Sequence, residues 1–143
     1  MELICPAGTP AAYREAAAAG ADAIYCGFRD ETNARNFPGL NFTPDELAAA
    51  IAHGRARGVK TFVAINTFMR AGAEAIWHGA VDNAVALEAD ALILADIGLM
   101  AYAAERHPGQ RIHVSVQASA SSADAVRFLI ELCGAKRVVL PRV

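Results

Sequence analysis

"EADALILADIGLMAYAAERHP", residues 88–108, holds the pattern that decides the fold. Residues 91–96 form a short apolar run of the length of a buried strand, and residues 97–107 read as a helix that Pro108 ends. A similar passage from a helix end into an apolar run recurs in "GADAIYCG" (20–27) and "GAKRVVLP" (134–141). Repeated βα units of this kind predict parallel strands, right-handed crossovers and an α/β domain.

Strand and helix signals alternate along the whole chain. Strands are predicted at residues 2–6, 23–28, 60–68, 91–96, 111–119 and 136–143. Helices are predicted from Thr9-Pro10 to Gly20, from a capping box at Thr43 and Glu46 to Gly58, and at residues 74–89, 97–107 and 122–134.

Six strands and five helices are too few for a complete (β/α)8 barrel, which has eight strands and roughly 200 residues or more. We therefore expect residues 1–143 to be the N-terminal part of a single TIM-type barrel domain, with the remaining strands absent from this chain. A nucleotide-binding doubly wound sheet is disfavoured, because the first turn, "PAGTPAA" (6–12), has one glycine and no GxGxxG.

Composition excludes several classes of protein. The net charge is −2 and the basic residues are scattered, so no nucleic-acid or anionic-membrane surface is indicated. Cys5, Cys26 and Cys133 are far apart, which indicates neither a disulfide framework nor a metal site within this chain. With no signal peptide and no long apolar run, we expect a cytoplasmic protein without a membrane span.

Polar residues follow the apolar runs of four predicted strands, where the active site of a barrel lies. These candidate substrate-binding residues are Asn66, Asp96, Gln117 and Arg142. Period-two alternation puts each of them on one face with the preceding residues: Phe62 and Ala64, Leu92 and Leu94, His113 and Ser115, and Val138 and Leu140. If those faces point into the barrel, the four side chains meet at its mouth. The alternative is that strand ends are polar because they meet water. We expect His113 itself to be a core residue and not a ligand.

The connection "CGFRDETNARNFPGLNFT" (26–43) is unusually long and polar. Loops longer than about 12 residues are usually functional or disordered. We expect Arg29, Asn33, Arg35 and Asn41 to bind substrate, since arginines bind carboxylates in pairs of hydrogen bonds. Burial of Phe37, Leu40 and Phe42 is expected to anchor the loop. In the alternative reading, Arg29 and Arg35 pair with Asp30 and Glu31 and only shape the loop.

Several of these stretches resemble a known family. "ELICPAGTPAA", "GADAIYCGFRDETNARNFPGLNF", "AINTF", "DALILADIGLM", "HVSVQAS" and "RVVLPRV" are together similar to the N-terminal part of the collagenase-like peptidase family U32. Within it they most resemble the UbiU branch, which takes part in oxygen-independent ubiquinone biosynthesis, and "DETNARNFPGLNF" is the segment that separates this branch from its relatives.

The resemblance implies a hydroxylation system in the full-length protein. It implies a heterodimer with a UbiV-like partner, prephenate as oxygen donor, a ubiquinone precursor as substrate and a [4Fe-4S] cluster whose four cysteine ligands lie outside this chain. The full-length protein would then be part of a hydroxylase and this fragment alone inactive. The residues of this chain identify no catalytic group.

Three alternatives stay open. Other branches of the family hydroxylate RNA bases, although no clustered basic and aromatic residues support such a role here. A peptidase-like role lacks a nucleophile and base pair. A non-catalytic scaffold for a quinone precursor is the third. For the fragment itself we expect self-association, because its first and last strands have open edges.

Overall fold

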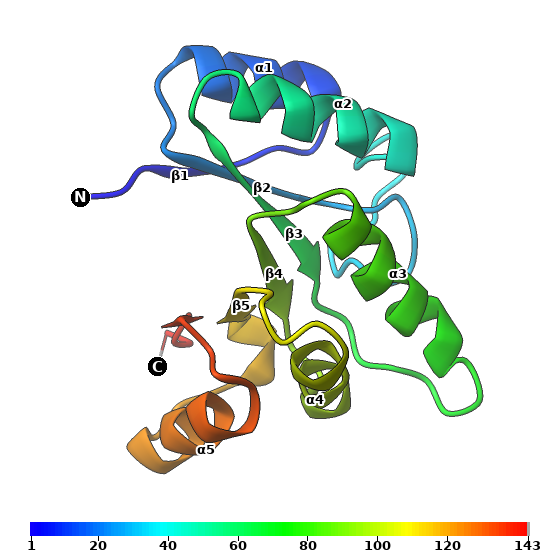
Figure 1. Ribbon diagram of the computed structural model, residues 1–143, viewed down its shortest axis with the longest axis vertical. Coiled ribbons are helices and arrows are strands. Elements are labelled where there is room, and N and C mark those ends of the chain that lie inside the picture. The colour runs from blue at the N-terminus through cyan, green and yellow to red at the C-terminus, as the bar shows by residue number, and fades with distance from the viewer. Residues whose placement is uncertain (143) are drawn as a thin grey trace.

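The computed structural model describes residues 1–142, and all six strands in that part lie parallel in one curled sheet (Figure 1). The strands are β1 (Ile4–Pro6), β2 (Ala23–Gly27), β3 (Lys60–Ile65), β4 (Ala91–Leu94), β5 (Ile112–Val114) and β6 (Arg137–Val138). Their order in the sheet is their order in the chain. This arrangement confirms the predicted incomplete α/β barrel.

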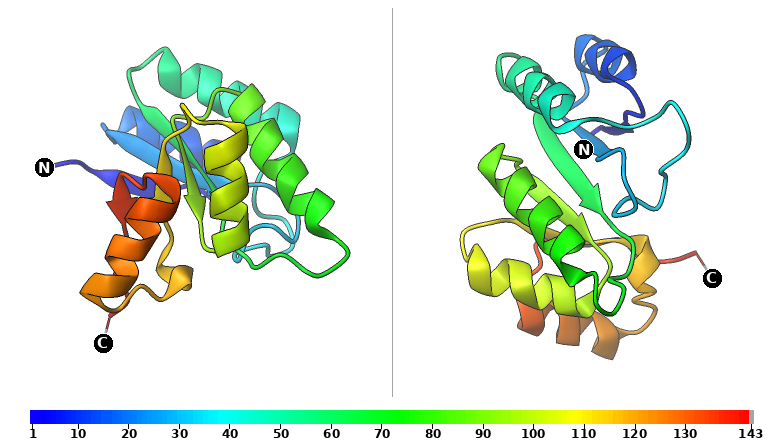
Figure 2. Two further views of the ribbon diagram at one scale, coloured as in Figure 1. Left: turned by 60° about the horizontal axis from the view of Figure 1, so that its bottom comes forward. Right: turned by 90° about the vertical axis from the view of Figure 1, so that its right-hand side faces the viewer.

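Five α-helices within residues 1–142 cover the convex face of the sheet (Figures 1 and 2). They are α1 (Pro10–Ala18), α2 (Pro44–Arg55), α3 (Glu74–Ala86), α4 (Ile97–Arg106) and α5 (Ala123–Cys133). The predicted helix starts are present: the Thr9 side chain accepts a hydrogen bond from Ala12 N, and Thr43 and Glu46 form the capping box. The helix count is therefore also as predicted.

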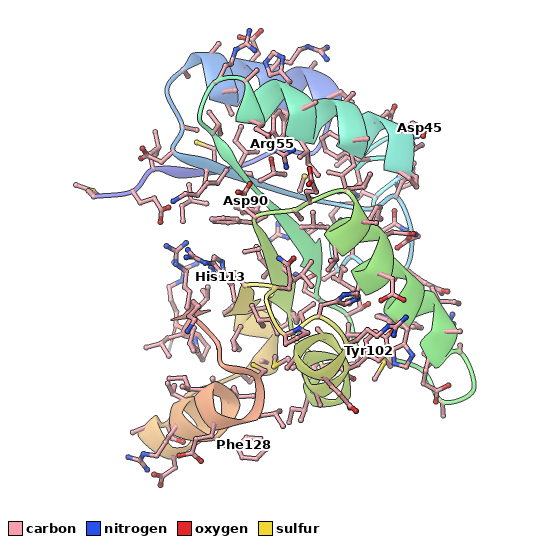
Figure 3. The ribbon with its side chains drawn as sticks, in the orientation of Figure 1. Asp45, Arg55, Asp90, Tyr102, His113 and Phe128 are labelled. Atoms are coloured by element: carbon pink, nitrogen blue, oxygen red, sulfur yellow. The ribbon has the colours of Figure 1, made fainter. Side chains whose placement is uncertain are left out.

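The two faces of the sheet differ in their packing. The main core lies between sheet and helices and includes Ile24, Val63 and Leu92. A smaller cluster of Ala23, Phe62 and Ala91 occupies the concave face, which corresponds to the barrel lumen. Figure 3 shows His113 on this inner side, and it is buried as expected.

The predicted inward faces of two strands are wrong. Leu92 and Leu94 belong to the main core and so face the helices, while Ala91 packs in the concave cluster. Val138 likewise packs against the main core, and its neighbour Arg137 stacks over Phe62 on the concave side. The alternation for β3 and β5 is correct, because Phe62 and His113 meet edge to face in the lumen.

All the strands after β1 end earlier than predicted, and the early ends of β5 and β3 bear on the site. β5 stops at Val114, since Ser115 caps a one-turn 3-10 helix, η1 (Val116–Ala118), by accepting a hydrogen bond from Gln117 N. β3 stops at Ile65, and Asn66 turns its backbone N–H to the carbonyl of Thr32. Both changes bring polar side chains out of the sheet at its C-terminal end.

An ion pair spans the opposite end of the sheet. Glu2, just before β1, pairs with Arg137 of β6, and Lys60 of β3 lies 3.7 Å from the same carboxylate. The first and last strands are thus tied to each other across the lumen. None of the helices described for residues 1–142 has the length and apolar character that spanning a bilayer requires.

Candidate substrate-binding site at the strand ends

The polar connection after β2 is a closed loop that lies across the ends of neighbouring strands (Figure 2). Phe28 and Phe42 form a parallel bridge at its base, with Arg29 N 2.9 Å from Phe42 O. Asn41 N donates to Gly8 O after β1 at 2.7 Å. The loop is therefore part of the folded domain.

The interior of this loop is held by two asparagines and by one of the three predicted apolar anchors. Phe42 is fully buried, but Phe37 is 56% exposed and Leu40 37% exposed, so two of the three expected anchors are wrong. Asn33 and Asn41 are buried instead.

These two asparagines fix the backbone of Arg35 between them. Asn33 Nδ2 donates to Asn41 Oδ1 at 2.9 Å, and Arg35 N donates to Asn33 Oδ1 at 2.9 Å. Asn41 Nδ2 donates to Arg35 O at 2.8 Å. Asn41 has a left-handed φ of 71°, a conformation that asparagine tolerates better than most residues. The side chain of Arg35 is left exposed on a fixed backbone.

Arg29 has a structural position. Its guanidinium donates to Asn41 O at 3.0 Å and pairs with Glu46 of the α2 capping box at 2.9 Å. The pairs of the alternative reading are therefore wrong for Arg29, because its carboxylate partner is Glu46 and neither Asp30 nor Glu31. Asp30 accepts hydrogen bonds from Thr32, and Glu31 pairs with Arg70.

The loop docks on the segment that follows β3. The carbonyl of Thr32 accepts from Asn66 N at 2.9 Å and from Thr67 N at 3.2 Å. Thr67 Oγ1 donates to Glu31 O at 2.7 Å and accepts from Trp77 Nε1 of α3 at 2.9 Å. Sequence reasoning missed Thr32 and Thr67, because the bonds that join the loop to the segment after β3 link residues more than 30 positions apart in the chain.

Asn66 and Gln117, two of the four strand-end candidates, meet directly. Asn66 Oδ1 accepts from Ala34 N of the loop at 3.0 Å, and Asn66 Nδ2 donates to Gln117 Oε1 at 3.3 Å. Ser115 Oγ donates to the same Gln117 oxygen. The loop, the end of β3 and the end of β5 thus share one hydrogen-bonded network.

The other two candidates lie apart from this network. Asp96 is the N-cap of α4: Oδ1 accepts from Leu99 N at 2.9 Å and Oδ2 accepts from Met69 N at 3.2 Å. Both carboxylate oxygens are therefore occupied by backbone donors. Arg142 is exposed near the end of the described residues. The structure brings together Asn66, Gln117 and the loop, while Asp96 serves a helix end.

Comparison with known proteins gives the family. The model of the family described as Peptidase family U32 matches residues 8–143. The chain belongs to peptidase family U32. It is 35% identical to the tRNA hydroxylation protein P of Escherichia coli over 99% of this chain and 30% of that protein. It is 32% identical to a collagenase of Porphyromonas gingivalis over 90% of this chain and 30% of that protein.

The U32 chain thus spans 30% of the length of these two relatives. Among solved structures it is similar to a type I 3-dehydroquinate dehydratase from Clostridium difficile, with a TM-score of 0.65 and 12% identity over 96% of this chain and 59% of that one. At this identity the likeness supports the barrel-type fold alone.

The three cysteines of this U32 chain do not come together as a cluster site among the described residues. Cys26 and Cys133 are buried, and burial raises the pKa of Cys26 to about 12 and also raises the pKa of Cys133. Cys133 Sγ donates to Leu129 O at 3.1 Å on α5. Within residues 1–142 no three His, Cys, Asp or Glu side chains gather as a metal site.

Proposed function

We propose that the full-length protein takes part in oxygen-independent hydroxylation of the ubiquinone ring, with prephenate as oxygen donor and a UbiV-like protein as partner. Hydroxylation is supported by a relative in family U32 that is named for tRNA hydroxylation. The ubiquinone branch is supported by the loop of residues 26–43, whose sequence resembles that branch and whose fold fixes it across the strand ends.

The charges around the loop favour a small anionic substrate over a nucleic acid. Arg29 and Arg70 are each paired with a glutamate, so they offer little to a phosphate backbone. Arg35 is exposed on a backbone fixed by Asn33 and Asn41. A single exposed guanidinium on a fixed backbone suits one carboxylate of a dicarboxylate such as prephenate. The exposed position of Arg35 on this fixed backbone is the observation on which the proposed anionic substrate rests.

The proposed [4Fe-4S] cluster would be held by cysteines outside this chain, as the family resemblance implies, since Cys5, Cys26 and Cys133 do not gather at one site within residues 1–142. Residues 1–142 would bind and orient the substrate over the strand ends through Arg35 and the network of Asn66 and Gln117. No chemical step is assigned to a side chain of this part of the protein.

RNA base hydroxylation is the second candidate, favoured by the name of the Escherichia coli relative. The deciding experiment expresses the full-length protein with a UbiV-like partner in an anaerobic host that lacks both. Ubiquinone and the nucleosides of digested tRNA are then quantified by mass spectrometry. Restored ubiquinone with unchanged tRNA supports the proposal, whereas restored nucleoside hydroxylation without ubiquinone overturns it. Oxygen from labelled prephenate is expected in the ubiquinone ring.

A further inference from the structure

The network at the end of β5 determines which atom of the Gln117 amide is available to a ligand. Ala34 N can only donate, so the Asn66 atom 3.0 Å away must be the acceptor Oδ1. The other Asn66 atom is then the donor Nδ2, and its Gln117 partner at 3.3 Å must be Oε1. A backbone N–H of the loop thus sets the orientation of both amides.

The amide nitrogen of Gln117 is left without a protein partner among residues 1–142. Its oxygen accepts from both Asn66 Nδ2 and Ser115 Oγ. Among residues 1–142, the buried side-chain nitrogen or oxygen atom without a hydrogen bond is Arg137 Nη1. Gln117 Nε2 also lacks a hydrogen bond but does not belong to that class, so it is not fully buried. Its two N–H groups are accessible and point away from the acceptor side of the network.

We propose that Gln117 Nε2 donates a hydrogen bond to a carboxylate oxygen of the substrate, and that Asn66 is a positioning residue that keeps this donor facing the ligand. The inference deepens the proposed function, since it rests on a small anionic substrate at the strand ends. A carboxylate fits because it only accepts hydrogen bonds. Arg35 follows Ala34 in the chain, and its exposed side chain carries a positive charge.

Asn66→Asp tests the orientation. Aspartate still accepts from Ala34 N, but its second oxygen cannot donate to Gln117. Gln117 then turns its Nε2 toward that oxygen and offers Oε1 to the substrate, which repels a carboxylate. We expect the Kd for prephenate to rise about tenfold or more, the loss of one hydrogen bond to a charged group. Gln117→Met removes the donor without adding charge and should weaken binding to a similar degree.

The measurement is calorimetric binding of prephenate to the full-length protein, with thermal unfolding of each variant in parallel. Asn36→Asp is the matched control: it adds the same charge to the exposed surface of the same loop, outside the network. We expect near wild-type affinity for the control. If Asn66 acts through Gln117, adding Asn66→Asp to the Gln117→Met variant should lower the affinity for prephenate little further.

Two results would overturn the inference: Gln117→Met that binds prephenate as tightly as wild type, or losses that simply add in the double variant. The ubiquinone assay separates this failure from failure of the proposed function. Unchanged binding by Gln117→Met, together with restored ubiquinone in the wild type, removes only the role of Gln117. A wild-type protein that binds no prephenate removes both proposals.

Discussion

Acidification from pH 6.5 to pH 4 is expected to destabilise the fold through His113. The imidazole is 3% exposed and lies edge-on to Phe62, with ring centroids 4.7 Å apart. The guanidinium of Arg137 lies 5.8 Å from the centre of the same Phe62 ring. Burial, followed by the positive charges of Arg137 and Arg111, lowers the pKa of His113 from 6.5 to about 4.

The sign follows from proton binding in the two states. Between pH 6.5 and 4 the unfolded chain binds a proton at His113 and the folded chain does not, so the folded state loses stability as the pH falls through this window. The shift from 6.5 to about 4 corresponds to about 3 kcal/mol of unfolding free energy. Carboxylates whose pKa is lowered, such as Glu46 and Asp82, lose their stabilising contribution as the pH falls below their usual values of 4.5 and 3.8, which is at the acid end of this window and beyond it.

Urea unfolding at a series of pH values measures this loss. In the variant His113→Gln, which stays neutral, we expect lower stability at pH 7, because the contact with Phe62 is lost, but a much flatter dependence between pH 6.5 and 4. An NMR titration of the imidazole should show a midpoint near 4. The reasoning would be refuted if the unfolding free energy of His113→Gln fell with pH as steeply as that of the wild type. It would also be refuted by an imidazole that titrates near its usual pKa.

Three further predictions concern the loop. Gly27→Ala places a Cβ 2.3 Å from Asn33 Nδ2, so urea unfolding should show a loss of roughly 1–3 kcal/mol. Asn41→Ala should be less stable than Asn41→Gly by about 1 kcal/mol in the same assay, because both lose the amide bonds but only glycine accepts a φ of 71° without strain. Arg35→Ala in the full-length protein should weaken use of an anionic substrate, while the free energy of unfolding stays within about 0.5 kcal/mol of wild type because the Arg35 side chain is exposed. Equal loss of activity and stability would make Arg35 structural.

The fold was predictable because its signals are local. The apolar run at β4, the Thr43 capping box and the αβ turn repeat each occupy fewer than about a dozen residues, within the range of periodicity and capping rules. The orientation of β4 was not predictable by the same rules. Strands of a parallel sheet are buried on both faces, so Leu92, Ile93 and Leu94 show no contrast between polar and apolar faces.

The candidate site was predictable in position and only partly in detail. Polar residues after apolar strands correctly indicated the end of the sheet where Asn66 and Gln117 meet. Asp96 lies apart from the network of Asn66 and Gln117 for a physical reason: an aspartate directly before a helix is also the preferred N-cap, and Asp96 has that role in α4. The role of Arg29 depends on Glu46, which lies 17 residues away in the chain. A pattern of neighbouring residues cannot predict a contact over that separation.

The loop is better described as a preorganised wall of the site than as a lid. A lid would be free to open, yet this loop is joined to the segment after β1 through Asn41 N, to the segment after β3 through Thr32 O and to α2 through Arg29. Ala34 N, in the middle of the loop, begins the series of bonds that orients Asn66 and Gln117. Under the proposed function, a substrate would meet donors already in place, and binding would not have to order the loop. Substitutions that loosen the loop at Asn33 or Asn41 should therefore weaken carboxylate binding at Gln117, although neither asparagine needs to touch the substrate.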